Sequence, residues 1–182
     1  MRSTFPSTDA MYATFDGILG ANLSAEIRDS AVAWYHDANG VAHRLCDIRP
    51  DWSLEVACCV ISAFSPRERW ESNVAKSIVY ATGIRPAGLG ANYRRAQDAE
   101  RNGFEALRGR KTNAFARAIY GEADAIVIDT WMLKAALCGR ETVTVKQYDA
   151  VADAVRRISP VYGMTPRETQ AAIWIIVRGS AK

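Results

Sequence analysis

The chain has 182 residues, of which 49% are hydrophobic and 24% charged, a composition typical of a globular protein with one domain or one domain of two lobes. No apolar run approaches the roughly 20 residues that a membrane helix needs, and the N-terminus lacks the hydrophobic segment of a signal peptide, so we expect a cytoplasmic protein with no membrane partner. The formal net charge of +3 permits nucleic-acid binding without requiring it.

Helical periodicity dominates the chain, and the alternation typical of strands is scarce, so we expect an all-α fold of about eight or nine helices. Residues 1–23 are expected to form an N-terminal arm with one short helix near 11–19, and residues 24–182 a single helical domain. In chain order, the expected helices cover residues 24–37, 54–64, 67–82, 91–101, 104–107, 113–120, 130–137, 144–158 and 168–178.

Local signals mark several of these boundaries. Asn39-Gly40 is expected to stop the first long helix. The run Leu54–Phe64 is nearly all apolar, which predicts a buried central helix, and Ser65-Pro66 breaks it. The segment Thr165–Glu168 combines a capping threonine, a proline at the first helical position and the glutamate of a capping box, so the last helix begins there.

Metal chemistry is limited by the small number of ligand residues. The chain has two histidines, and its four cysteines, which show no CxxC spacing, are Cys46, Cys58, Cys59 and Cys138. This pattern argues against a zinc site and an iron–sulfur cluster. Cys58 and Cys59 lie in the apolar run and are expected to be buried thiols. We therefore expect no metal and no cofactor.

Basic residues gather in two stretches, which contain Arg67, Arg69 and Lys76, and then Arg94, Arg95, Arg101, Arg108, Arg110 and Lys111. Such clusters suit nucleic-acid phosphates. They are equally typical of the solvated faces of amphipathic helices, and charge alone leaves both interpretations open. Trp70 stands among charged residues, where an exposed indole could stack on a base. The remaining tryptophans are expected in the core, at Trp34, Trp52, Trp131 and Trp174.

The most informative pair is Lys111 and Asp129, which are 18 residues apart with one expected helix and a return loop between them. This spacing allows an amine at the start of one helix to meet a carboxylate at the start of the next. Such a pair is the minimum equipment for nucleophilic attack on an electrophilic carbon. Each residue also has a purely structural interpretation, because a surface lysine is tolerated at a helix N-terminus and aspartate is a favoured N-cap.

The segment 109–113, Gly-Arg-Lys-Thr-Asn, followed by Ile-Asp-Thr-Trp at 128–131, resembles the core of the helix-hairpin-helix DNA glycosylases, the endonuclease III-like superfamily. In that family a glycine-rich hairpin leads into a helix with the catalytic lysine, and a Val-Asp-Thr-His-like segment carries the catalytic aspartate. Residues 54–66 are similar to the family's buried helix ending in Leu-Ser-Ala-Gln. Residues 170–179 are similar to its late Trp-Leu-Ile-Leu-His-Gly helix.

The resemblance implies a two-lobed fold with a cleft between the lobes, without an iron–sulfur cluster. It also implies a DNA N-glycosylase, with or without AP-lyase activity, that acts on a flipped modified or damaged pyrimidine nucleotide. Lys111 would attack C1′ of the sugar, and Asp129 would stabilise the cationic sugar and move protons. The candidates for DNA contact are Arg108, Gly109, Arg110, Thr112, Arg67, Trp70 and Asn73.

Several positions depart from the family pattern. The hairpin at 107–110 is two residues shorter than the family's Leu-Pro-Gly-Val-Gly, Phe64 replaces the glutamine, and Trp131 replaces the histidine. These losses resemble a divergent, often phage-encoded branch associated with DNA base hypermodification, for which the location would be the host cytoplasm. Two alternatives follow. One is a hypermodification enzyme acting on a modified thymine, and the other is a non-catalytic helical DNA-binding module.

Overall fold

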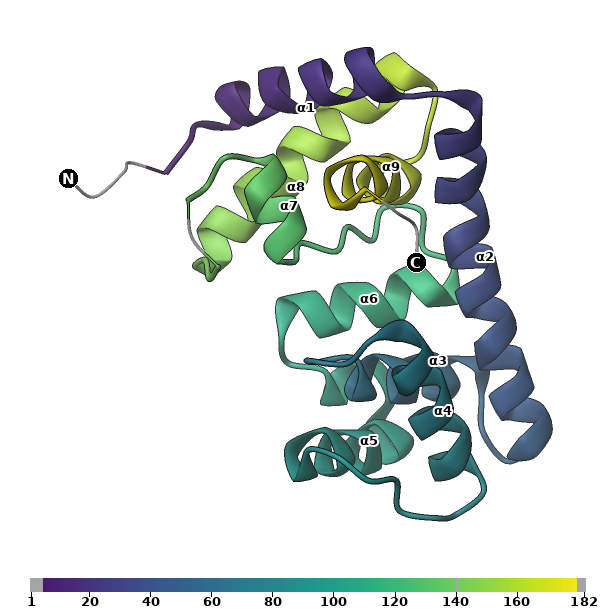
Figure 1. Ribbon diagram of the computed structural model, residues 1–182. Coiled ribbons are helices and arrows are strands. Elements are labelled where there is room, and N and C mark those ends of the chain that lie inside the picture. The colour runs from purple at the N-terminus through teal and green to yellow at the C-terminus, as the bar shows by residue number, and fades with distance from the viewer. Residues whose placement is uncertain (1–4, 140, 180–182) are drawn as a thin grey trace. The chain divides into compact units, whose positions relative to one another are not determined.

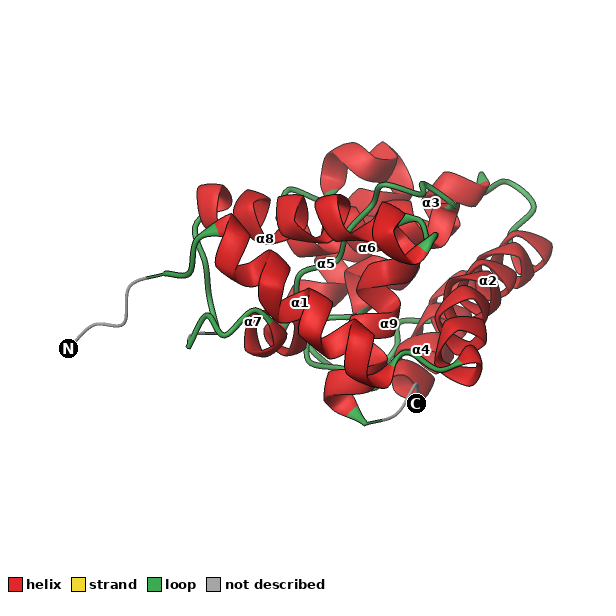
Figure 2. Ribbon diagram, turned by 90° about the horizontal axis from the view of Figure 1, so that it is seen from above, coloured by secondary structure: helices red, strands yellow, loops and turns green. Residues whose placement is uncertain are grey.

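The computed structural model describes residues 5–139 and 141–179, and every regular element in that part of the chain is helical (Figure 1, Figure 2). The prediction of an all-α fold is therefore confirmed. The elements are α1 Thr8–Asn22, α2 Ala25–Ile48, α3 Leu54–Phe64, α4 Trp70–Ala81, α5 Gly90–Asn102, η1 Gly103–Ala106, α6 Arg110–Tyr120, α7 Thr130–Ala135, α8 Val145–Ile158, η2 Ser159–Tyr162 and α9 Pro166–Arg178, where η denotes a 3-10 helix. None of these described helices is both long and apolar enough to span a membrane.

The chain forms two compact units, and it passes from one to the other within α2 and again between residues 122 and 123. Unit 1 contains residues 1–34 and 123–182, and unit 2 contains residues 35–122. The formal charge is divided unevenly between them. Unit 2 has 13 basic and 10 acidic residues, so 13 − 10 = +3, whereas unit 1 has 10 of each, so 10 − 10 = 0. The net positive charge of the chain therefore belongs to unit 2.

Unit 1 is held together by contacts of α9 with α1, α7 and α8, and by contacts of α1 with α8 (Figure 1). Helix α1 begins after the N-cap Ser7 and buries Met11, Phe15 and Leu19, which lie four residues apart along one face. The segment expected to be an N-terminal arm is thus largely a 15-residue helix that supplies core side chains. The expected helix at 11–19 is its central part, and residues 1–4 lie outside the described chain.

Unit 2 is organised around α3, which packs against α4, α5 and α6. Every residue of α3 from Ala57 to Phe64 is buried, as its apolar sequence predicts. The helix begins at the N-cap Ser53, whose hydroxyl accepts a hydrogen bond from the N–H of Val56 (3.2 Å). The predicted bounds of this helix, Leu54–Phe64, are confirmed.

Several helix boundaries differ from expectation; for example, α6 begins at Arg110, three residues earlier than predicted, and α7 ends at Ala135, two residues earlier. For two others the structure shows the cause. Helix α2 continues through Asn39-Gly40 to Ile48, because the buried stripe continues on the far side at Ala42 and Leu45. The Asn39 amide, expected to favour a stop, instead donates to the carbonyl of Ile119 (2.9 Å). Helix α4 begins at Trp70, three residues later than predicted, because Arg67 has a positive φ of 63° that a helix does not permit.

Candidate functional site

A hairpin segment at residues 103–109 joins α5 to α6 in unit 2. Gly103 ends α5 with φ of 53°. The N–H of Phe104 then donates to Glu55 Oε1 (2.9 Å), and the side-chain amide of Asn113 donates to the carbonyl of Phe104 (3.0 Å). These bonds tie the hairpin segment to α3 on one side and to α6 on the other, so the start of α6 has a defined position within unit 2.

Lys111 is the second residue of α6, and the N-cap Gly109 has no side chain that could form a capping hydrogen bond. Its side chain is exposed and makes no hydrogen bond or ion pair with any residue in the described part of the chain. The first turn contains no acidic residue, and its two cations oppose the helix dipole at roughly 0.3–1 kcal/mol each. The prediction that Lys111 lies at a helix N-terminus is confirmed, and its amine is accessible to a ligand.

The loop between α3 and α4, residues 65–69, lies beside the first half of α6. Just before the loop, Ser62 Oγ donates to the carbonyl of Thr112 (2.6 Å). Just after it, the Trp70 ring packs edge-on against Phe115 with 6.5 Å between ring centroids. The loop and the start of α6 therefore form one neighbourhood of unit 2. We call its exposed cations the basic cluster, which consists of Arg67, Arg69, Arg108, Arg110 and Lys111.

Asp129 is the N-cap of α7 in unit 1, which confirms its predicted structural role. Its Oδ1 accepts hydrogen bonds from the N–H groups of Trp131 (2.9 Å) and Met132 (3.0 Å). Its Oδ2 accepts a third from the indole N–H of Trp174 in α9 (2.9 Å). The half-buried carboxylate is thus fixed from two helices. A carboxylate offers about four acceptor positions, so three bonds leave room for one more donor.

The two tryptophans that donate hydrogen bonds to Asp129, Trp131 and Trp174, make further contacts within unit 1. The rings of Trp34 and Trp174 are tilted against each other with centroids 6.4 Å apart, and the Arg178 guanidinium lies 4.6 Å from the Trp174 ring. Lys134 Nζ lies 4.2 Å from the Trp131 ring. These three tryptophans, which we expected in the core, keep part of their surface exposed.

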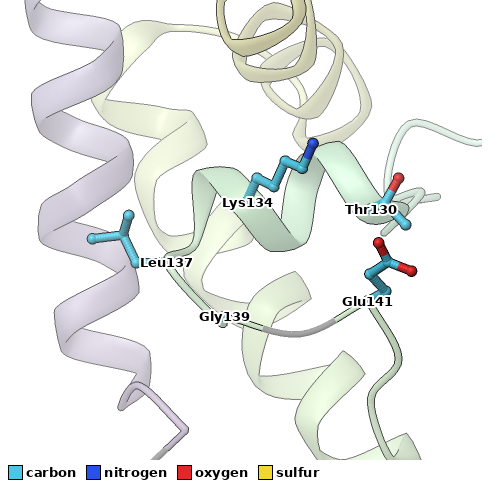
Figure 3. A pocket seen from close by; sticks show the side chains of 5 residues that line it. All are labelled: Thr130, Lys134, Leu137, Gly139 and Glu141. Carbon is cyan, nitrogen blue, oxygen red and sulfur yellow. The ribbon is translucent and has the colours of Figure 1, made fainter. Parts of the chain in front are cut away.

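A hollow of about 440 Å³ follows Asp129 along α7 and the turn after it (Figure 3). Its walls include one cation and one carboxylate, and it is lined by Thr130, Lys134, Leu137, Gly139 and Glu141. All of these residues belong to unit 1. The hollow therefore lies next to the Asp129 cap, and neither Lys111 nor the rest of the basic cluster lines it.

The predicted DNA-contact residues differ in their exposure. Arg67, Arg108 and Arg110 are exposed, whereas Trp70 is half-buried against Phe115. The Asn73 side chain is 2% exposed and accepts a weak hydrogen bond from Ser77 (3.4 Å), so it is a packed residue of α4 and we withdraw it from the set.

The remaining two predicted contacts are Gly109 and Thr112, at the start of α6. The Thr112 hydroxyl donates to the Gly109 carbonyl (3.0 Å), so it stabilises the turn, while Gly109 itself is exposed.

The two predicted catalytic residues belong to different units, Lys111 to unit 2 and Asp129 to unit 1. Nowhere in residues 5–139 and 141–179 do three His, Cys, Asp or Glu side chains gather in a way that could hold a metal ion.

The sequence did not reveal two features of these sites. The hydrogen bond from Trp174 to Asp129 joins residues 45 positions apart, and no local sequence pattern predicts it. The ion pair between Glu68 and Lys76 fixes the loop 65–69 and was also not foreseen. Glu68 lies in the loop before α4, outside the helix that carries Lys76, so no helical spacing connects the two residues.

The comparison with known protein families covers nearly the whole chain. Residues 16–181 match the model of a family described as "Family of unknown function (DUF7178)", and the chain belongs to this family. No curated protein and no solved structure matches it. The family description gives no activity, so the function is argued from the chemistry of the residues described above.

Proposed function

We propose that this protein is a DNA glycosylase-like enzyme that cleaves the bond between a modified or damaged pyrimidine and its deoxyribose, with or without a following lyase step. Its partner is DNA, and the basic cluster of unit 2 holds the phosphates. Lys111 is the nucleophile, and Asp129 stabilises the positive charge that develops on the sugar. The proposal requires both side chains to reach the same flipped nucleotide.

The proposed reaction begins with Lys111 as the free amine. Its nitrogen forms a bond to C1′ while the bond from C1′ to the base breaks, and the electron pair leaves with the base, which takes up a proton. The bond from C1′ to O4′ of the sugar ring then breaks, O4′ takes up a proton from water, and a protonated imine remains on Lys111. The Asp129 carboxylate is held still by three hydrogen bonds, so it can stabilise the cationic sugar without reorganising.

The single observation that carries this proposal is the placement of Lys111. It is an exposed amine in the first turn of α6, where a cation lowers helix stability, and it has no acidic partner in the part of the chain that the structure describes. A side chain that weakens its own helix and forms no ion pair is well explained by chemistry or ligand binding. The excess positive charge of unit 2 supports a polyanionic partner.

A second candidate is a non-catalytic helical DNA-binding module. The observation that favours it is the set of hydrogen bonds on Asp129, since a carboxylate that caps α7 and binds Trp174 has a complete structural role. In this case DNA binding depends on the basic cluster of unit 2 and is independent of Asp129. Substitution of Asp129 by asparagine, which still caps a helix, would then leave DNA binding intact.

Borohydride trapping tests the proposed function directly. The protein is mixed with DNA that contains an abasic site or a modified pyrimidine, and borohydride reduces the imine to a stable amine that joins protein to DNA. We expect a covalent complex with the wild type and none with Lys111→Gln. Lys146→Gln is the matched control, because Lys146 is also exposed and is also the second residue of a helix, α8.

If Lys111→Gln is trapped as well as the wild type, then another amine of the protein reacts, or several amines react without specificity. In either case Lys111 is not the nucleophile. Mass spectrometry of nucleosides from treated DNA then separates the reaction types. A released free base supports the glycosylase, whereas an altered nucleoside supports a hypermodification enzyme acting on a modified thymine.

A further inference from the structure

Arg67 has a backbone conformation that arginine rarely adopts. Its φ is 63°, and among the described non-glycine residues only Leu137, with φ of 54°, shares this left-handed region. The conformation brings Cβ close to the following carbonyl oxygen and lowers stability for any residue other than glycine. No ion pair of the Arg67 side chain compensates for this loss of stability, because the side chain is exposed and contacts no acidic residue of the described chain.

The residues around Arg67 hold the strained loop in place. The Asn92 side-chain amide donates to the carbonyls of Pro66 (3.0 Å) and Phe64 (3.4 Å). The N–H of Glu68 donates to the carbonyl of Ser65 (3.2 Å) and closes the turn across Arg67. Both neighbours of Arg67 in the loop are therefore fixed by bonds to buried or adjacent groups, and the arginine between them is presented outward.

The second half of the loop is fixed by the Glu68 carboxylate. It forms an ion pair with Lys76 and accepts a hydrogen bond from Ser72 (2.8 Å), and its side chain is only 14% exposed. Lys76 and then Ser72 hold the pKa of Glu68 below its ordinary value. Gly88 passes so close that a Cβ there would lie 2.9 Å from Lys76 Nζ. The loop is thus clamped between α4 and the segment before α5.

The strained loop belongs to the same neighbourhood as Lys111. The contacts of Ser62 with Thr112 and of Trp70 with Phe115 hold its two ends against α6. Arg69, which is also exposed, follows Arg67 within this loop. Strain that the surrounding structure maintains, in a loop whose two most exposed residues are arginines, is typical of a preorganised binding site.

We propose that residues 65–69 form a rigid phosphate-binding loop in which Arg67 and Arg69 hold the DNA strand on which Lys111 acts. This rests on the proposed function for the identity of the partner. Guanidinium groups suit phosphate because they donate in a planar fork, and a fixed loop loses little entropy when they bind. The loop thereby binds the DNA backbone independently of base sequence.

The test is DNA binding and stability in the full chain with Arg67→Gly, which removes both the cation and the strain. We expect the thermal midpoint to stay the same or rise by up to about 4 °C. The Kd for a short fluorescein-labelled DNA should rise about five- to tenfold. The slope of log Kd against log salt should fall by about 0.9 on duplex or 0.7 on a single strand, as expected for one lost phosphate contact.

Three further variants separate charge from strain. Leu137→Gly removes the same kind of strain in unit 1 without removing a charge, so the salt dependence of DNA binding should be unchanged. Arg67→Asn keeps a residue that tolerates positive φ and should bind DNA as weakly as Arg67→Gly. Arg44→Ala removes an exposed cation of unit 2 outside the basic cluster and should bind like the wild type.

Several outcomes would overturn the loop assignment. The assignment is wrong if Arg67→Gly binds DNA as tightly as the wild type, or if both Arg67 variants have a lower thermal midpoint. It is also wrong if the wild type shows no salt-dependent binding of either DNA, or if it binds polyglutamate as tightly as DNA. Failure of the glycosylase proposal looks different. In that case Lys111 traps no DNA, while Arg67→Gly still loses affinity and salt dependence.

Discussion

Trp174 donates its indole N–H to Asp129 Oδ2 over 2.9 Å, although the two residues are 45 positions apart in the chain. The bond joins α9 to the N-terminus of α7, where Oδ1 of the same carboxylate already caps the helix. One side chain therefore stabilises a helix end and a contact between two helices of unit 1. Any substitution of Asp129 that tests catalysis also tests these two structural roles.

Trp174→Phe should reduce the free energy of unfolding by about 1–2 kcal/mol, because it removes one donor from a carboxylate while keeping most of the ring. Asp129→Ala should cost about 1–2 kcal/mol through the lost cap. In a double-mutant cycle measured by urea unfolding, we expect a coupling of at least about 0.5 kcal/mol. Strictly additive losses would mean that the indole bond contributes nothing in solution.

Lys111→Gln should have opposite effects on stability and on chemistry. Replacing a cation in the first turn of α6 removes an unfavourable interaction with the helix dipole, so the unfolding free energy should rise by about 0.3–1 kcal/mol. Trapping on DNA should be lost. Lys146→Gln should give a similar gain in stability with trapping intact, and urea unfolding beside the borohydride assay checks both. A clear loss of stability in Lys111→Gln would assign the lysine a structural role.

The sequence predicts those parts of the fold whose signals are local. The N-cap Ser53 and the break at Ser65-Pro66 define α3, and the capping box at Thr165 defines the start of α9, which the structure confirms. Helix α2 passes through Asn39-Gly40 because a tertiary hydrogen bond to Ile119 and a continuing buried stripe outweigh the local preference for a stop.

The candidate site follows the same rule. The helix-start position of Lys111 and the capping role of Asp129 depend on neighbouring residues, and both were predicted. The positive φ of Arg67 was not, because it results from bonds with Asn92 and from the clamped Glu68 rather than from the sequence of the loop itself. Long-range bonds of this kind leave no periodic signal in the chain.

Glu100 should make the stability of unit 2 dependent on pH. Its carboxylate accepts hydrogen bonds from Tyr80 Oη (2.6 Å), Trp52 Nε1 (3.1 Å) and Arg49 Nη2 (2.8 Å). Burial by itself would raise the pKa of Glu100, but these three donors outweigh it and hold the pKa below its ordinary value of 4.5. The stabilisation is therefore complete above about pH 5 and is lost as the pH falls through the lowered pKa.

Glu100→Gln should cost about 1–3 kcal/mol of unfolding free energy near pH 6, and the difference from wild type should shrink near pH 3.5. Urea unfolding at both pH values measures it. Glu105→Gln, at an exposed carboxylate of η1, is the control and should change stability by less than about 0.5 kcal/mol at either pH. A Glu100→Gln deficit that stays constant with pH would show that the carboxylate charge is not what stabilises this cluster.

Gly103 and Gly40 should respond in opposite directions to alanine. Gly103 has φ of 53°, and a Cβ there would lie 2.1 Å from Glu55 Oε1, the atom that accepts the Phe104 N–H. Gly103→Ala should therefore cost about 2–3 kcal/mol, since it adds backbone strain and displaces the bond that ties the hairpin segment to α3. Gly40 lies inside α2 with open space around it, so Gly40→Ala should gain about 0.5–1 kcal/mol.

Glu55→Ala separates the two parts of the Gly103→Ala cost. Without the Glu55 side chain there is no clash, but the Phe104 N–H has also lost its acceptor. If the collision matters, the double variant Glu55→Ala, Gly103→Ala should lose less than the sum of the single losses, by at least about 0.5 kcal/mol in urea unfolding. Additive losses would instead place the whole cost in the backbone of Gly103.

Gly103→Ala also tests whether the hairpin segment positions the start of α6, because the Phe104 carbonyl accepts the hydrogen bond from Asn113 in that helix. Weaker DNA binding by Gly103→Ala, with all residues of the basic cluster unchanged, would show that it does.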